Sequence, residues 1–153
     1  MTHSDSLAFG AVYPLSKNLI SRILDDKRLV FAKFLAHRSP ETNLGTGSLI
    51  LFYETGGIKS IVGEAMINRV EFIKPYEIEF TGSRRFFLER EEFASYVNKF
   101  PGREKKAMLV AYLESLKRYE VPRKWPYPMT MAGQYITRDE YLEIIGGDCV
   151  RQC

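Results

Sequence analysis

The chain has 153 residues, of which 45% are apolar and 27% are charged, and its formal net charge is +3. These values are ordinary for one globular domain that is long enough to bury a core. No apolar run approaches the ~20 residues of a membrane span, and the N-terminal MTHSDSLAFG lacks the basic and apolar regions of a signal peptide. We therefore expect a single cytoplasmic domain over residues 7–146, with flexible tails at 1–6 and 147–153.

The cysteines and histidines are too few, and too far apart in the chain, to form a structural metal site. Cys149 and Cys153 lie in the last five residues, and His3 and His37 are the two histidines. A zinc site needs four such ligands, and a domain of this size needs no disulfide. We expect neither a metal nor a cofactor.

The chain begins with the pattern of a strand followed by a short helix. Residues 8–13 are apolar enough for a strand, which Pro14 ends. Ser16 is a candidate N-cap, and apolar residues at helical spacing within 19–24 give the helix one buried face.

Three further strands are predicted in the first half of the chain. In residues 29–35 the alternation places Lys33 among apolar neighbours, and residues 48–53 are an uninterrupted apolar run. Residues 60–73 form a long alternating strand with Gly63 in its interior. A glycine there indicates a bend, a bulge or the close approach of another group.

The second half of the chain predicts two helices and one short strand. Residues 89–98 have a helical apolar face, and 134–137 read as a strand. The T-x-x-E sequence at Thr137 is a capping box for a helix over 138–145, which Gly146 is expected to end. Several strands with helices between them favour a small closed or partly open β-barrel.

The segment 106–119 is ambiguous by pattern alone. It is rich in Ala, Met, Leu, Glu and Lys, and Leu109, Leu113 and Leu116 recur at helical spacing. Propensity therefore favours a helix, although tertiary context can override it.

The order of short motifs along residues 8–145 resembles the PUA-like superfamily, in particular its ASCH-type and archaeal uncharacterised branches. These motifs are a strand ending in YP, then DDKR, FAKF, GTGSLILFYE, VGEA, FIKP, RYEVP and MAGQYIT. The resemblance implies an α+β fold, a pseudo-barrel of five to six mostly antiparallel strands with peripheral helices. It also implies that 106–119 is a strand of the barrel, and we predict a strand there.

The resemblance implies a role in binding RNA or a modified base, and the residues themselves point to the same class of ligand. The stretch KRYEVPRKWPYPMTMAGQY at 117–135 combines cations with aromatic rings, which suit phosphates and unstacked bases. We expect one basic, aromatic-lined cleft. Its candidate binding residues are Lys33, Glu64, Arg28, Arg38, Arg85, Arg123, Lys124, Trp125 and Tyr127.

Each of the main candidates has a structural alternative. Lys33 and Glu64 are expected to face the same cleft, and they could instead form an ion pair at the barrel rim. Trp125 could stack on a base, or it could close the end of the barrel as a core residue. Arg85 and its neighbours could bind phosphate or be solvated surface charges.

Two other functions stay open at this point. Some ASCH-type proteins are amidohydrolases of acylated cytidine that use a Lys, a nearby Thr and a Glu, whereas the matching Lys27-Arg28-Leu29-Val30 offers no hydroxyl nucleophile. We assign no catalytic residue and favour non-catalytic binding. A protein-interaction module, with dimerisation through the apolar faces of the helices, is the third alternative.

Overall fold

The structure is a computed structural model, and it describes residues 7–34, 43–78, 80, 85–130 and 133–152, with side chains described as far as Gly146.

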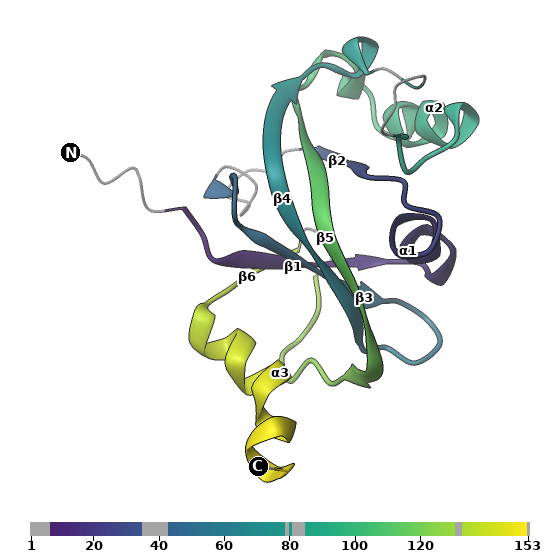
Figure 1. Cartoon of the computed structure of the whole chain (residues 1–153). Coiled ribbons are helices and arrows are strands. Elements are labelled where there is room, and N and C mark those ends of the chain that lie inside the picture. Colours follow the sequence, from purple (N-terminus) through teal and green to yellow (C-terminus); the bar gives the residue numbers. More distant parts are fainter. Residues whose placement is uncertain (1–6, 35–42, 79, 81–84, 131–132, 153) are drawn as a thin grey trace, which may run out of the picture.

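Six strands form one curled sheet, as the resemblance implied (Figure 1). The strands are β1 Gly10–Leu15, β2 Val30–Phe34, β3 Leu49–Glu54, β4 Ile61–Ile73, β5 Met108–Arg123 and β6 Gln134–Ile136, in the order β2-β5-β4-β3-β1-β6. All neighbouring strands are antiparallel except β1 and β3. The sheet curls enough for the rings of Tyr13 on β1 and Phe31 on β2, strands that do not pair, to pack at a tilt with their centroids 5.6 Å apart. The predicted pseudo-barrel is therefore confirmed.

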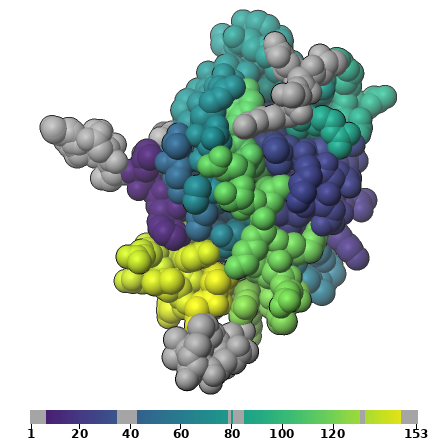
Figure 2. All heavy atoms as spheres, viewed as in Figure 1, coloured from purple at the N-terminus to yellow at the C-terminus, as the bar shows by residue number. Residues whose placement is uncertain are grey.

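Within the described residues, three α-helices and two short 3₁₀ helices surround the sheet. They are α1 Lys17–Leu24, α2 Arg90–Asn98, α3 Arg138–Gln152, η3 Pro75–Glu77 and η4 Arg103–Lys105. Helices α1 and α2 lie on one side of the sheet, and α3 lies at the opposite end of the molecule (Figure 1). The space-filling view shows β5 running down the face between these two groups (Figure 2).

The helix starts follow the predicted capping residues. The Ser16 side chain accepts a hydrogen bond from the Leu19 amide at 3.3 Å and so begins α1. Thr137 and Glu140 form the reciprocal capping box of α3, at 2.8 and 3.1 Å. The predicted end of α3 was wrong. Gly146 is not among the residues with positive φ, so the left-handed turn of a glycine C-cap does not form and the helix continues.

The ambiguous segment is strand β5, and the helix favoured by its composition does not form. β5 hydrogen-bonds to β2 along one edge and to β4 along the other. Its first four residues, Met108 to Ala111, are buried. A central strand satisfies its backbone polar groups in the sheet while burying both faces, which outweighs the small helical preference of its residues.

Gly63 sits where another group comes close. A β-carbon there would lie 2.6 Å from the Lys117 carbonyl oxygen and 2.6 Å from a methyl group of Leu24. The pairing of β4 with β5 also shifts register between Ile61 and Gly63. The glycine therefore permits both the bulge and the packing of α1 against the sheet.

Two hydrophobic clusters make up the core. The first cluster lies between the sheet and the helices α1 and α2, and it includes Tyr13, Phe31, Phe87 and Phe93. The second cluster contains Trp125 and is packed against residues of α3. Trp125 is the predicted site residue that belongs to a cluster among the described residues, and the cluster is the second.

Candidate functional site

A cleft lies in the first cluster, where the end of β1, helix α1, strand β2 and helix α2 meet. Its volume is about 520 Å³, and Lys33 is among its lining residues. We call it the Lys33 cleft. Ligand sites for small molecules have volumes of ~300–1,000 Å³, so the cleft can hold a nucleotide-sized group.

The floor of the Lys33 cleft is aromatic. Tyr13, Phe31 and Phe87 are almost completely buried, and the half-buried Tyr96 adds a wall from α2. The Lys33 ammonium lies 5.4 Å from the centroid of the Tyr13 ring. A cation over a ring face is favourable, and it places positive charge beside a flat apolar surface.

The mouth of the Lys33 cleft is polar. Four exposed residues line it: Ser16 and Asn18 at the start of α1, Ser95 on α2, and Lys99 just after α2. Their hydroxyl, amide and ammonium groups can donate hydrogen bonds to carbonyl or phosphate oxygens. The cleft therefore combines an apolar floor with donors around its edge.

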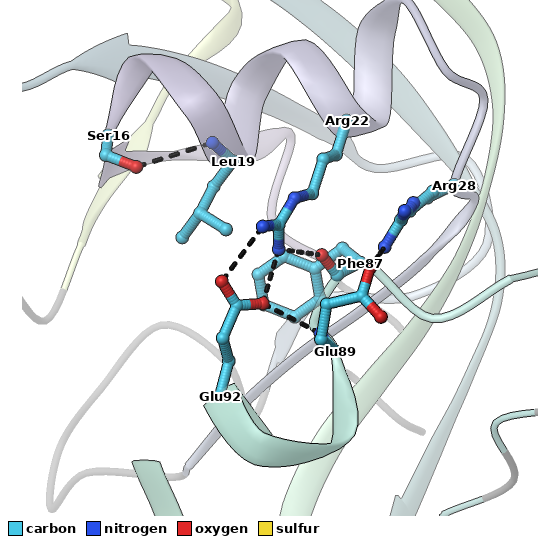
Figure 3. A network of polar contacts seen from close by, with 7 residues as sticks. All are labelled: Ser16, Leu19, Arg22, Arg28, Phe87, Glu89 and Glu92. Atoms are coloured by element: carbon cyan, nitrogen blue, oxygen red, sulfur yellow. Dashed lines mark hydrogen bonds and ion pairs between the residues drawn. The ribbon is translucent and has the colours of Figure 1, made fainter. Parts of the chain in front are cut away.

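One wall of the cleft is held by an ion-pair network between α1, α2 and the segment before α2 (Figure 3). The Arg22 guanidinium contacts both carboxylate oxygens of Glu92, the second at 2.9 Å, and it also donates to the Phe87 carbonyl at 3.2 Å. Arg28 pairs with Glu89 at 2.8 Å beside it. The hydrogen bonds from Arg22 lower the pKa of Glu92 to about 2, so this carboxylate is ionised at neutral pH.

Arg28 and Arg85 line a separate, smaller pocket rather than the Lys33 cleft. This pocket, which we call the arginine pocket, has a volume of about 270 Å³ and also contains Arg90. Arg85 donates to the Asp26 carbonyl at 3.1 Å. Arg90 lies over the Phe80 ring at 4.6 Å.

Arg123, Lys124 and Tyr127 line a third depression, of about 390 Å³, at the other end of the molecule against α3. Glu140 and Glu143 line it too, so its basic residues face acidic ones. The Arg123, Lys124 and Tyr127 side chains of the predicted loop therefore lie at the surface of the α3 end.

Glu64 and Trp125 do not line the Lys33 cleft. The Glu64 carboxylate accepts hydrogen bonds from the hydroxyls of Tyr119 at 2.6 Å and Tyr141 at 2.8 Å, beneath α3. Burial and these hydrogen bonds raise the pKa of both tyrosines. Trp125 is 8% exposed in the second cluster.

The expectation that Lys33 and Glu64 share one cleft is therefore wrong, and Trp125 occupies the core position that was its alternative. Trp125 has its ring edge-to-face with Tyr127 at 5.0 Å. The candidate residues of the one basic cleft predicted from the sequence lie in three separate places, because they come from opposite ends of a long curled sheet. Arg38 lies outside the described residues.

Sequence reasoning missed the partners that complete the Lys33 cleft. Arg22 and Glu92 are separated by 70 positions, and neither stands out locally, because each is one charge on the polar side of a short helix. Tyr13 and Tyr96 read as core residues. The available signal was Lys33 itself. An inward-facing lysine needs a partner for its ammonium group, and an aromatic ring could have been sought for that role.

The described part of the chain has no helix long and apolar enough to cross a membrane. Within the same residues, no three His, Cys, Asp or Glu side chains gather in a way that could hold a metal ion.

Comparison with known proteins supports the fold. Residues 8–138 match the family described as Domain of unknown function (DUF365). The chain is 32% identical over 103 residues to Uncharacterized protein MJECS03 of Methanocaldococcus jannaschii, which covers 63% of this chain and 95% of that protein.

Two solved structures share the architecture. The ASCH protein of Zymomonas mobilis superposes with a TM-score of 0.71 at 14% identity, covering 88% of this chain and 92% of that one. The N-terminal domain of Staphylothermus marinus McrB gives 0.61 at 13% identity, covering 95% and 98%. At such low identity the likeness concerns the fold, and it confirms the predicted ASCH-type, PUA-like architecture.

Proposed function

The chain belongs to the family described as Domain of unknown function (DUF365), and we propose that it binds RNA or a modified nucleotide, with a base in the Lys33 cleft, without turning the ligand over. The observation that supports this proposal is the position of Lys33, a half-buried lysine, over the aromatic floor of a cleft of about 520 Å³.

A nucleobase matches this combination of groups. It is flat and apolar on its faces, and it carries carbonyl and ring-nitrogen acceptors on its edges. The rings of the floor provide the apolar contact, and Lys33 donates to a base carbonyl or a phosphate oxygen. The exposed Lys99 at the mouth adds a second positive charge, which favours an anionic ligand over a neutral one.

The hydrolase alternative lacks a suitable carboxylate. Glu92 is the one carboxylate among the described residues that line the cleft, and its pKa of about 2 makes it a weak proton acceptor at neutral pH. Both of its oxygens already accept hydrogen bonds from Arg22. Glu64, the other carboxylate considered from the sequence, lies under α3. These contacts favour binding over catalysis.

The interaction-module alternative is also less well supported. The large apolar side chains that are exposed among the described residues are spread along the chain from Leu7 to Leu142, and they include Ile58 before β4 and Phe100 after α2. A docking surface for a protein partner would gather them into one patch.

The test is a titration of the purified protein with the four ribonucleoside 5′-monophosphates, followed by calorimetry or by NMR shifts. We expect Lys33→Met to weaken binding about tenfold or more, because a hydrogen bond to a charged group contributes ~1.5–3 kcal/mol. Lys105→Met is the matched control, since Lys105 is exposed on η4 and does not line the cleft.

The melting temperature separates binding from stability. Lys33→Met should leave it nearly unchanged. A large loss of stability with unchanged affinity would assign Lys33 a structural role and contradict the proposal. Incubation of the protein with acylated cytidine, with the products followed by chromatography, would reveal any turnover.

A further inference from the structure

The arginine pocket adjoins the Lys33 cleft. Leu88 lines both of them. The segment carrying Arg85 runs alongside the start of β2, where the Val30 amide donates to the Arg85 carbonyl at 3.1 Å and the Phe87 amide donates to the Val30 carbonyl at 3.0 Å. Lys33 is three residues further along the same strand. The two sites are thus fixed relative to one another by backbone pairing.

Two of the three arginines in the pocket have most of their hydrogen-bonding capacity available. Arg85 is exposed and makes one recorded hydrogen bond, to a backbone carbonyl. Arg90 is exposed and stacks on Phe80, and no hydrogen-bond acceptor for it lies among the described residues. A guanidinium that stacks through its face keeps its edge free for an oxyanion.

The third arginine sits deeper. Arg28 is 18% exposed and is neutralised by Glu89 at 2.8 Å. Its Nε atom is buried and has no hydrogen-bond partner among the described residues. Glu91, also on the lining, is exposed and lowers the net positive charge. The pocket therefore suits one anionic group held by Arg85 and Arg90 rather than a highly charged ligand.

We propose that the natural ligand is a single-stranded nucleic acid, with one base in the Lys33 cleft and the phosphate of an adjacent nucleotide in the arginine pocket. This inference rests on the proposed function and goes beyond it, because a free nucleotide would use the cleft alone. Contacts to successive phosphates hold a strand in register while the cleft takes one base.

The experiment compares ligands that differ only in length. Fluorescence anisotropy and calorimetry are used with the four homopentaribonucleotides and with their matching 5′-monophosphates. We expect the wild-type protein to bind one or more of the pentamers at least about tenfold more tightly than the matching monophosphate. The double variant Arg85→Gln/Arg90→Gln should lose this advantage and bind the monophosphate as the wild type does.

Salt dependence provides a second measurement. Each phosphate contact that is lost reduces the slope of log affinity against log salt by ~0.7 for a single strand. Because the double variant loses one phosphate contact, we expect its slope to be smaller by ~0.7. Arg138→Gln is the matched control, because Arg138 is an exposed arginine at the start of α3 and lines neither site. Arg85→Gln alone, which removes one hydrogen bond, serves if the double variant is unstable.

The outcomes separate the two proposals. Equal affinities for pentamer and monophosphate, or a length advantage that survives in the double variant, would overturn the inference and leave the proposed function standing. Failure of the wild type to bind either ligand would overturn the proposed function itself.

Discussion

Arg22 of α1 and Glu92 of α2 form a two-point ion pair on the lining of the Lys33 cleft, with the Arg22 Nη2 atom 2.9 Å from the Glu92 Oε2 atom. Because the two residues come from different walls, their pairing fixes the separation of these walls. α2 also provides Tyr96, whose hydroxyl accepts a hydrogen bond from the Phe34 amide at 3.2 Å. The shape of the cleft therefore depends on contacts at both ends of α2.

Arg22→Met should destabilise the protein more than Glu92→Gln. The arginine change removes the ion pair and leaves the Phe87 carbonyl without its donor, at a cost of ~1–3 kcal/mol. Glu92→Gln keeps the side-chain oxygen that accepts from the Glu89 amide, so its cost should stay below ~1 kcal/mol, as for other partly exposed ion pairs. Urea unfolding of both variants measures the difference. Equal costs would show that the Phe87 contact contributes nothing.

Stability should fall in acid partly because of the same pair. The pKa of Glu92 is lowered from 4.5 to about 2 in the folded chain, so the unfolded chain binds a proton first as the pH drops. The contribution of the pair is thus present above pH 4.5 and is lost as the pH falls toward 2. The free energy of unfolding, measured with urea between these pH values, should depend less on pH in Glu92→Gln than in the wild type. Parallel curves for the two proteins would contradict this role.

The barrel could be predicted from the sequence, although one strand required more than propensity. Apolar runs and alternation gave the strands before residue 73, and capping patterns gave the starts of α1 and α3. Segment 106–119 has helical composition and is nevertheless β5. Its conformation is decided by hydrogen bonds to β2 and β4, which residue preferences do not encode. The order of the motifs, rather than their composition, carried that prediction.

The candidate site was only partly predictable for a related reason. Lys33 was recognisable as a charge within an apolar strand, and it lines the cleft of about 520 Å³ between β1, α1, β2 and α2. Glu64 met the same criterion, yet it accepts hydrogen bonds from two tyrosines under α3. Alternation shows that a side chain points inward, and it does not show toward which end of a curled sheet. Placing Lys33 and Glu64 at their different ends of the sheet requires the pairing register of the strands.

Tyr119 and Tyr141 should not ionise in the folded protein at a pH at which exposed tyrosines do. Burial is the largest cause that raises the pKa of each, and the negative charge of Glu64 adds to it. In the unfolded chain these tyrosines ionise near pH ~10. Their contribution to stability is therefore retained below that pH and is lost as the pH rises further.

A spectrophotometric titration near 295 nm checks this expectation. The chain has nine tyrosines, and the last ones should titrate together with alkaline unfolding followed by circular dichroism. Tyr119→Phe should reduce the late phase without changing the early one. Smooth titration of every tyrosine before unfolding would show that the Glu64 cluster is open to solvent.

Gly63→Ala should be among the most damaging single changes. The added methyl group would lie 2.6 Å from the Lys117 carbonyl oxygen and from a Leu24 methyl group. The carbonyl belongs to the paired strand β5 and cannot move without disturbing the sheet. The expected cost is ~1–3 kcal/mol or more, as for other overpacked cores.

Gly146→Ala is the control, because no atom lies within 4 Å of the added methyl group there and alanine in a helix interior gains ~0.5–1 kcal/mol over glycine. Thermal and urea unfolding of the two variants should therefore shift in opposite directions. Similar midpoints for Gly63→Ala and the wild type would mean that α1 and β4 can separate freely, and the packing of α1 against the bulge would then contribute little to the fold.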